Sequence, residues 1–382
     1  HIKIKISCEM KNGYVWEIRT RIFFYIALCI ALVFMMQHSV TWKLPDFIEL
    51  LLKYIVLLLS LIRFMAVLPL YTKKEVLFIL FFFPIIGLIG VKTGNLNYVF
   101  LPFIFGLIAK GLYLKDIIKC YFVFCWILIV GTFLCCHMGL LENMVSFREE
   151  KVRNSFGFIY ATDFAAHIFY LVLMYFYLRS GKFNLIEIML FLYSSFFIAN
   201  QCDARLDSIC IIMIVFFSIY INLTKGRDYY FSGYKYIFPL CALLIIFLTY
   251  LYGNIYSTGD DFILLINFFL SGRLALGFDA LMSKGIPLLG QKYIQYGAGS
   301  GIYYNFIDSS YLVLLIIYGI ILFLLVMYVY VRICSHCISI RNRVLLYVLF
   351  IIAINSMIEQ HFMEFAYNPF YMAFSAKLIK ST

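Results

Sequence analysis

The sequence of 382 residues has few charged side chains, which make up 13% of it, and little proline or tryptophan, with seven and three residues. A soluble domain of this size is roughly a quarter charged. The scarcity of charge therefore excludes an ordinary soluble enzyme or binding domain. Apolar residues take the place of the missing charge: 64% of the chain is hydrophobic, and the mean hydropathy is +0.94.

The apolar residues form long runs that lack the two-residue alternation of a membrane β-barrel. Runs such as IFFYIALCIALVFMM approach the roughly 20 residues that a membrane-crossing helix needs. The pattern predicts an all-α, polytopic membrane helix bundle, with residues 1–382 as a single integral membrane domain. We expect about twelve transmembrane segments, near 22–38, 47–70, 76–91, 97–109, 117–136, 162–178, 185–200, 207–223, 237–252, 309–331, 344–358 and 365–377. The segments 97–109 and 365–377 are short; the alternative is that they are re-entrant, which leaves ten or eleven crossings.

Basic residues are unevenly distributed over the expected loops. The expected cytoplasmic ends and loops hold 20 of the 31 Lys and Arg residues, whereas the expected external loops hold nine. By the positive-inside rule, both termini are predicted to be cytoplasmic. The basic net charge is thus a consequence of topology, and no nucleic-acid partner is expected. Lys53 and Arg63 fall within the second segment, where we expect them to snorkel or to face the bundle interior.

Long hydrophilic stretches are also rare, and one stands out at residues 253–308. We interpret it as a large external loop, periplasmic or extracellular. Within it, Asp261 to Met282 has helical character that is interrupted at Gly272, which indicates helices on the membrane surface. Loops of this length are usually functional or disordered, and the Phe, Leu and Tyr content argues against disorder.

Signatures of bound metals or cofactors are missing. The chain has no DxD pattern, and Cys334 and Cys337 have CxxC spacing without a second pair. We therefore expect neither a metal nor a cofactor.

Three stretches carry a resemblance to a known family: RNSFGFIYATDF, ARLDS, and GRLALGFDALMSKGIPLLGQ leading to IDSSYLVLLIIYGII. In their order they resemble the Wzy-type polymerases of O-antigen and capsular polysaccharide, which belong with the O-antigen ligases. The resemblance covers about residues 148–330. One departure is that Arg273 is followed by Gly285, one residue too far for the Arg-x10-Gly pattern of some polymerases.

The resemblance implies a glycosyltransferase at the outer face of a bacterial cytoplasmic (inner) membrane. A glycan on undecaprenyl diphosphate would move onto a new lipid-linked repeat unit. The implied partners are these donor and acceptor undecaprenyl-diphosphate-linked oligosaccharides and membrane lipid, together with a chain-length regulator and a flippase.

A departing diphosphate needs cationic donors, and the planar arginine fork suits phosphate oxygens. By the resemblance, Arg153, Arg205 and Arg273 fit this role. The alternative is that they are solvated or pair with neighbouring aspartates. Arg273 has no carboxylate at the same-face positions of its helix, so we expect it to await a phosphate.

The acceptor hydroxyl needs a base or a hydrogen-bond acceptor. Asp308 is the candidate by its position, and its alternative role is to cap a helix that begins at Ser309. Further candidates for substrate binding are ionisable groups near the ends of segments and aromatic rings that can stack on sugars. The ionisable residues are Asp163, His167, Glu359 and His361, and the aromatic residues are Tyr303 and Tyr304. A satisfied interhelical hydrogen bond is the alternative for His167, and packing at the membrane interface is the alternative for the tyrosines.

Three other functions remain open. A ligase would differ from a polymerase only in its acceptor. Another polyprenyl-phosphate-dependent glycosyltransferase would depend on Asp46 in the first external loop. An oligosaccharide flippase should have two related halves and short loops, whereas this chain has one dominant loop and no evident repeat.

Overall fold

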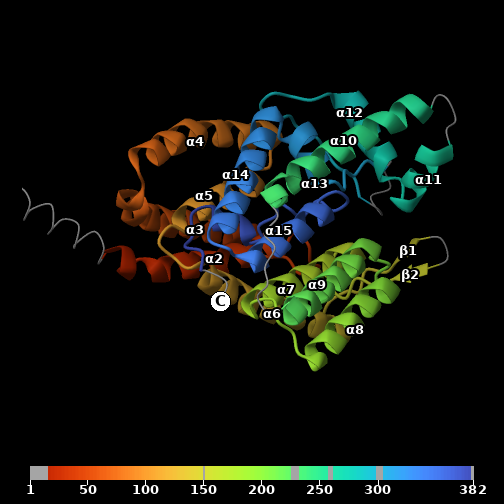
Figure 1. The fold of residues 1–382 in the computed structure, drawn as a ribbon, viewed down its shortest axis with the longest axis horizontal. Helices are drawn as coiled ribbons and strands as arrows, with labels where there is room; N and C mark the ends of the chain where they lie inside the picture. Colours follow the sequence, from red (N-terminus) through yellow and green to blue (C-terminus); the bar gives the residue numbers. More distant parts are fainter. Residues whose placement is uncertain (1–15, 149–150, 225–231, 257–260, 298–303, 380–382) are drawn as a thin grey trace, which may run out of the picture. The chain divides into compact units, whose positions relative to one another are not determined.

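The computed structural model describes residues 16–148, 151–224, 232–256, 261–297 and 304–379, excluding the side chains of residues 255, 256 and 261. The chain forms two compact units. Unit 1 comprises residues 1–79, 102–228 and 365–382, and unit 2 comprises residues 80–101 and 229–364. Figure 1 shows both as assemblies of helices, with one short hairpin in unit 1.

Among the described residues, eight helices have the length and the apolar composition to cross a membrane, and a bent pair makes a ninth if it counts as one span. Three further apolar helices are shorter: Leu96–Ile108, Leu185–Gln201 and Arg343–Asn355. The prediction of an all-α membrane helix bundle is confirmed.

Unit 1 consists mainly of helices. Its elements are α2 (Arg21–Met36), α3 (Asp46–Val67), η1 (Leu68–Leu70), α6 (Leu114–His137), β1 (Ser146–Arg148), β2 (Lys151–Arg153), α7 (Ala161–Leu178), α8 (Leu185–Gln201), α9 (Arg205–Thr224) and η4 (Phe370–Phe374). Helix α7 lies at its centre, packed against α6, α8 and α9 (Figure 1). Its apolar window is 78% buried, against 28% for α3, so α7 is the core helix of this unit.

Unit 2 contains η2 (Ser232–Tyr236), α10 (Ile237–Tyr256), α11 (Asp261–Phe269), α12 (Arg273–Lys284), α13 (Ser310–Leu312), the π-helical turn η3 (Val313–Ile317), α14 (Ile320–Ser339) and α15 (Arg343–Asn355). Helix α10 contacts α11, α12, α13, α14 and α15 and is therefore the hub of the unit. Two helices are divided between the units. Helix α4 (Lys73–Thr93) begins in unit 1 and ends in unit 2, and α5 (Leu96–Ile108) begins in unit 2 and ends in unit 1.

The interruption predicted at Gly272 is confirmed. Helices α11 and α12 meet at a bend of 101°. Ser271 and Gly272 have φ values of +55° and +80°, in the left-handed region that ends a helix. The bend places Arg273 at the first position of α12.

Arg63 faces the interior of unit 1, which is one of the two positions expected for it, the other being a snorkelling side chain. It is completely buried, and its guanidinium donates to the Glu17 side chain at 3.0 Å and to the Glu17 carbonyl at 2.6 Å. Lys53 forms an i, i+4 pair with Glu49 within α3.

The expected helix at 365–377 is wrong. In that stretch only Phe370–Phe374 forms a short 3-10 helix, yet most of the segment is buried. The Tyr121 hydroxyl donates to the Phe365 carbonyl, and Lys377 pairs with the backbone at Leu112 and Leu114. An irregular chain is tolerated at membrane depth where protein surrounds it, because its polar backbone groups find partners there.

The segment expected at 309–331 is also not one helix. It begins as α13, passes through the π-helical turn η3 and breaks at Gly319, whose φ is +89°, before α14. Residues 287–291 cover the break. The backbone nitrogen of Gln291 donates to the Ile317 carbonyl at 2.9 Å, and the backbone nitrogen of Ile320 donates to the Pro287 carbonyl at 3.0 Å. The broken helix thus binds part of the predicted loop through backbone groups that a regular helix would use internally.

Candidate functional site

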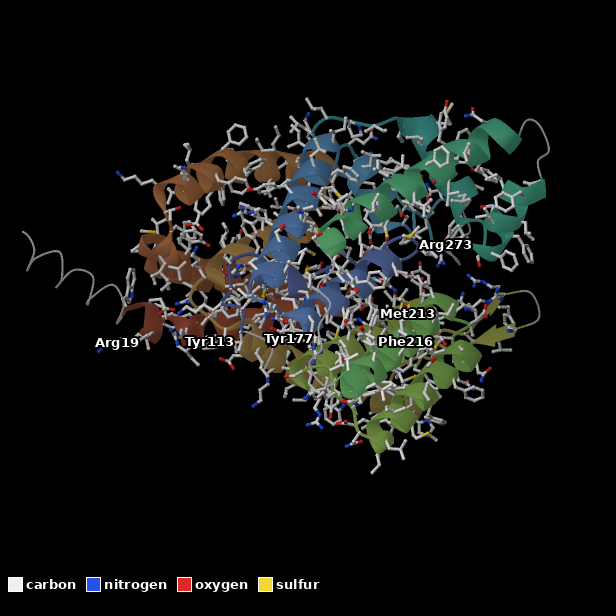
Figure 2. The ribbon with its side chains drawn as sticks, in the orientation of Figure 1. Arg19, Tyr113, Tyr177, Met213, Phe216 and Arg273 are labelled. Atoms are coloured by element: carbon white, nitrogen blue, oxygen red, sulfur yellow. The ribbon has the colours of Figure 1, made fainter. Side chains whose placement is uncertain are left out.

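Arg273 lies in unit 2 between two carboxylates from distant parts of the sequence. Its Nε donates to Asp308 Oδ2 at 2.9 Å, and its Nη2 donates to Glu359 Oε1 at 3.2 Å. The three side chains are between 8% and 18% exposed, so the ion pairs are largely shielded from solvent. The Arg273 side chain is labelled in Figure 2.

Backbone contacts hold the two carboxylates in place. Asp308 lies two residues before the short α13, and Glu359 follows α15. The Ser310 hydroxyl donates to the Glu359 carbonyl at 2.5 Å, and the Ser310 amide donates to the Ser356 carbonyl at 3.0 Å. These bonds fasten residues 308–310 to residues 356–359, so both carboxylates are positioned before any substrate binds.

His361 and Glu364 extend the group of ionisable side chains. His361 Nδ1 lies 3.1 Å from Glu364 Oε2, and its Nε2 lies 3.9 Å from Glu359 Oε2. The His361 side chain is 3% exposed. Arg273, Asp308, Glu359, His361 and Glu364, which we call the Arg273 cluster, therefore form a continuous chain of acidic and basic groups.

Two expectations for the Arg273 cluster are wrong. Arg273 has no carboxylate partner within its own helix, but it has two in space, at sequence separations of 35 and 86 residues. Asp308 does not cap a helix at Ser309: α13 begins at Ser310 with Ser309 as its N-cap residue, and the Asp308 carboxylate pairs with Arg273.

Of the two tyrosines predicted to stack on sugar rings, the structure describes only one. Tyr303 lies outside the described residues. Tyr304 is 36% exposed, and it lies close enough to Arg273 for the two groups to interact electrostatically. Tyr304 therefore borders the Arg273 cluster.

A second cluster lies in unit 1 around the buried Asp203. Arg148, Lys151 and Arg205 approach its carboxylate at 3.2, 3.8 and 3.3 Å. Arg153, on β2, donates from Nε to the neighbouring Cys202 carbonyl at 2.8 Å. We call these five charged residues the Asp203 cluster; Arg153 and Arg205, both predicted site residues, belong to it.

Positive charge gathers at Asp203, because three cations, Arg148, Lys151 and Arg205, share its carboxylate. Burial raises the pKa of Asp203, but Arg205 and Arg148 lower it more, so the net pKa is below the ordinary value. Asp203 also has a φ of +49°, a conformation that is unusual for a non-glycine residue. The electrostatic character of this cluster suits an anion.

The hairpin that contributes to the Asp203 cluster has two unlike faces. Phe147 and Val152 are opposite each other in the β1–β2 register and are 74% and 50% exposed. Successive side chains of a strand point to opposite faces, so Arg148, Lys151 and Arg153 lie on the other face. That face is the one that meets Cys202 and Asp203.

The other two predicted residues of unit 1 are buried in helix α7. His167 is 1% exposed, lies 3.1 Å from the Ser39 hydroxyl and stacks on the Tyr367 ring at 3.9 Å. His167 thus has a satisfied hydrogen bond, as its alternative required, although the partner lies in the turn after α2 and not in a helix; the side chain leaves no surface for a sugar. Asp163 is 8% exposed in the first turn of α7, where a carboxylate is favourable for the helix dipole.

Sequence patterns indicated most members of both clusters, but they did not show the part played by Asp203. The sequence suggested it only as one of the aspartates near the arginines, whereas in the structure it is the centre of a cluster. Within the described part of the chain, no group of three or more His, Cys, Asp or Glu residues is arranged to hold a metal ion.

Comparison with protein-family models, with curated proteins and with solved structures finds no match to this chain.

Proposed function

We propose that this chain is a glycosyltransferase that joins undecaprenyl-diphosphate-linked oligosaccharide repeat units, as the Wzy-type polymerases do. The observation that carries the proposal is the Arg273 cluster, in which segments near residues 273, 308 and 359 bring a cation and two carboxylates into direct contact. Groups whose positions are fixed before reaction are the main requirement for a transfer of this kind.

The Arg273 cluster supplies the acid–base chemistry. The acceptor hydroxyl gives its proton to Asp308, which is the more exposed of the two carboxylates at 18% against 8%. Its oxygen forms a bond to the anomeric carbon of the donor, the bond from that carbon to the diphosphate oxygen breaks, and undecaprenyl diphosphate leaves with the electron pair. Arg273 positions Asp308, while Glu359 fixes the other side of the guanidinium.

The Asp203 cluster, in unit 1, offers an anion-binding surface of its own, with Arg153 and Arg205 among its members. Arg205 is 54% exposed and Lys151 is 65% exposed, so both can exchange solvent for phosphate oxygens. We propose that this surface binds phosphate groups of a lipid-linked substrate, independently of the Arg273 cluster.

The topology that goes with this function has twelve crossings. The eight long helices, the three shorter apolar helices and the buried irregular segment 365–377 would make up that number. Both termini are then cytoplasmic, residues 253–308 are the large external loop, and the bent pair α11–α12 lies at the outer surface. The membrane is the bacterial cytoplasmic membrane.

Glycan analysis of cells that lack this gene tests the proposal. A polymerase predicts that mass spectrometry finds single repeat units attached to the final acceptor, with no longer chains. Free polymer that accumulates on the carrier lipid would instead indicate a ligase, and unchanged glycans would contradict both.

A further inference from the structure

A pocket of about 670 Å³ opens in unit 2 beside the C-terminal half of α12. Its lining comes from three parts of the chain, α12, residues 292–296 and residue 305, and includes Asp279, Lys284, Lys292, Tyr293, Tyr296 and Asn305. Pockets of roughly 300–1,000 Å³ are typical of small-molecule sites, so a sugar unit or two would fit. None of these residues belongs to the Arg273 cluster.

Asn305 gives the pocket a fixed wall. Its side-chain oxygen accepts from the Tyr296 amide at 2.6 Å, and its side-chain nitrogen donates to the Ile294 carbonyl at 3.0 Å. Its backbone carbonyl accepts from the Tyr293 hydroxyl at 3.2 Å. These bonds clamp residues 293–296 against residue 305, so the lining is built by the protein and does not depend on a ligand.

Three charges in the lining have not neutralised one another. Lys284, Lys292 and Asp279 are all exposed, and within the described part of the chain none of them forms an ion pair within 4.0 Å. Two ammonium groups can receive a carboxylate, and the Asp279 carboxylate can accept hydrogen bonds from hydroxyl groups. A ligand that satisfies all three must carry both functions.

Two half-buried tyrosines complete the lining. Tyr293 and Tyr296 offer rings with polar ends, which suit the apolar faces and hydroxyl rims of sugar rings. Burial, together with the nearby Asp279 carboxylate, raises the pKa of Tyr293, as expected for a phenol that lies between the protein and that carboxylate. The Tyr293 hydroxyl therefore remains a neutral hydrogen-bond donor.

We propose that this pocket binds a sugar residue that carries a carboxylate, so that the glycan handled by the enzyme contains an acidic sugar. The sugar carboxylate lies between Lys284 and Lys292, its hydroxyls face Asp279, and its ring lies against Tyr293 and Tyr296. The identification of the ligand as part of the glycan rests on the proposed function. The pocket's preference for an acidic over a neutral sugar does not.

Saturation-transfer NMR on the full chain in lipid nanodiscs tests the preference. The probes are a disaccharide ending in glucuronic acid and its neutral counterpart ending in glucose. We expect the acidic probe to bind at least about fivefold more tightly, as two partly exposed ion pairs allow. The double variant Lys284→Gln/Lys292→Gln should abolish that preference while binding of the neutral probe changes little.

Lys235→Gln is the matched control, because Lys235 lies in unit 2 over the Tyr236 ring, outside the pocket. It should keep the preference. Equal binding of the two probes to the wild-type protein, or a preference that survives in the double variant, would overturn the inference. If the double variant loses the preference for the acidic probe but cells still make polymer without Arg273, the inference about the pocket holds. The proposed function alone is then overturned.

Discussion

A Cβ atom added to Gly319 would lie 2.6 Å from the backbone nitrogen of Gly290, so two backbone segments touch at this pair of glycines. Both residues have positive φ values, +82° at Gly290 and +89° at Gly319. The contact fixes residues 285–291 onto the break between η3 and α14. A side chain at Gly319 would separate the two segments, and one at Gly290 would meet Thr93 Cγ2 at 2.9 Å and the Ile317 carbonyl oxygen at 3.2 Å.

Gly319→Ala should therefore destabilise the protein. The substitution adds both a steric clash with backbone atoms and an unfavourable backbone conformation, together worth about 1–3 kcal/mol or more. Thermal unfolding in detergent, followed by size-exclusion chromatography, is the measurement. Gly87→Ala is the control, since a Cβ there meets nothing within 4 Å and alanine favours the interior of helix α4, so its melting temperature should equal or exceed that of the wild type.

Arg63→Met should lower the melting temperature strongly. The guanidinium is fully buried against Glu17, and removal of one partner of a buried pair costs about 3–5 kcal/mol because the other charge stays behind. Lys110→Met breaks the more exposed Lys110–Glu75 pair, where the loss should be below about 1 kcal/mol. Equal effects of the two substitutions would show that burial of Arg63 does not matter.

The Asp203 cluster should lose stability in acid. The folded-state pKa of Asp203 is lowered, so its stabilisation is complete above the unfolded pKa near 4 and disappears as the pH falls below that value. Asp203→Asn should reduce the acid dependence of the melting temperature between about pH 6 and pH 3. The control is Asp46→Asn, at an exposed position at the start of α3. A wild-type acid profile in Asp203→Asn would contradict the assignment.

Cysteine labelling tests the proposed orientation. Leu288 is 60% exposed in the proposed external loop, and Ser232 is exposed in the proposed cytoplasmic loop before α10. An impermeant maleimide added to whole spheroplasts should label Leu288→Cys but not Ser232→Cys, with the unsubstituted protein as the background. Labelling of both from the same side would overturn the orientation.

Hydropathy was sufficient to predict the helices because long apolar runs have few alternatives in a membrane. It could not show which groups form hydrogen bonds with the backbone N–H and C=O groups. Residues 365–377 are as apolar as a helix, but the bundle supplies partners such as Tyr121, so the chain stays irregular. At Gly319 the same pattern conceals a break that is satisfied by residues 287–291.

The candidate residues were predictable from the resemblance and from the chemistry of the proposed reaction, but their partners were not. Sequence neighbours of Arg273 offered no carboxylate, and helical spacing says nothing about Asp308 and Glu359 until α13 and α15 are folded. For His167 the sequence suggested a function that the packing does not allow. Its type and position suggested a ligand contact, and only the packing of Ser39 and Tyr367 reveals that it is enclosed.

The polymer-length distribution made by cells whose only copy of this gene carries a variant tests the central claim most directly. Arg273→Lys, Asp308→Asn and Glu359→Gln should each lose most of the polymer ladder. A lysine cannot pair with two carboxylates through a planar fork, an amide at position 308 cannot accept the proton, and an amide at position 359 removes the charge that fixes the guanidinium. Glu75→Gln, which removes a carboxylate from an unrelated ion pair, should keep it. With the ladder normalised to the amount of folded protein in the membrane, the account predicts loss of polymer in all three cluster variants. A near wild-type ladder from Arg273→Ala would contradict it.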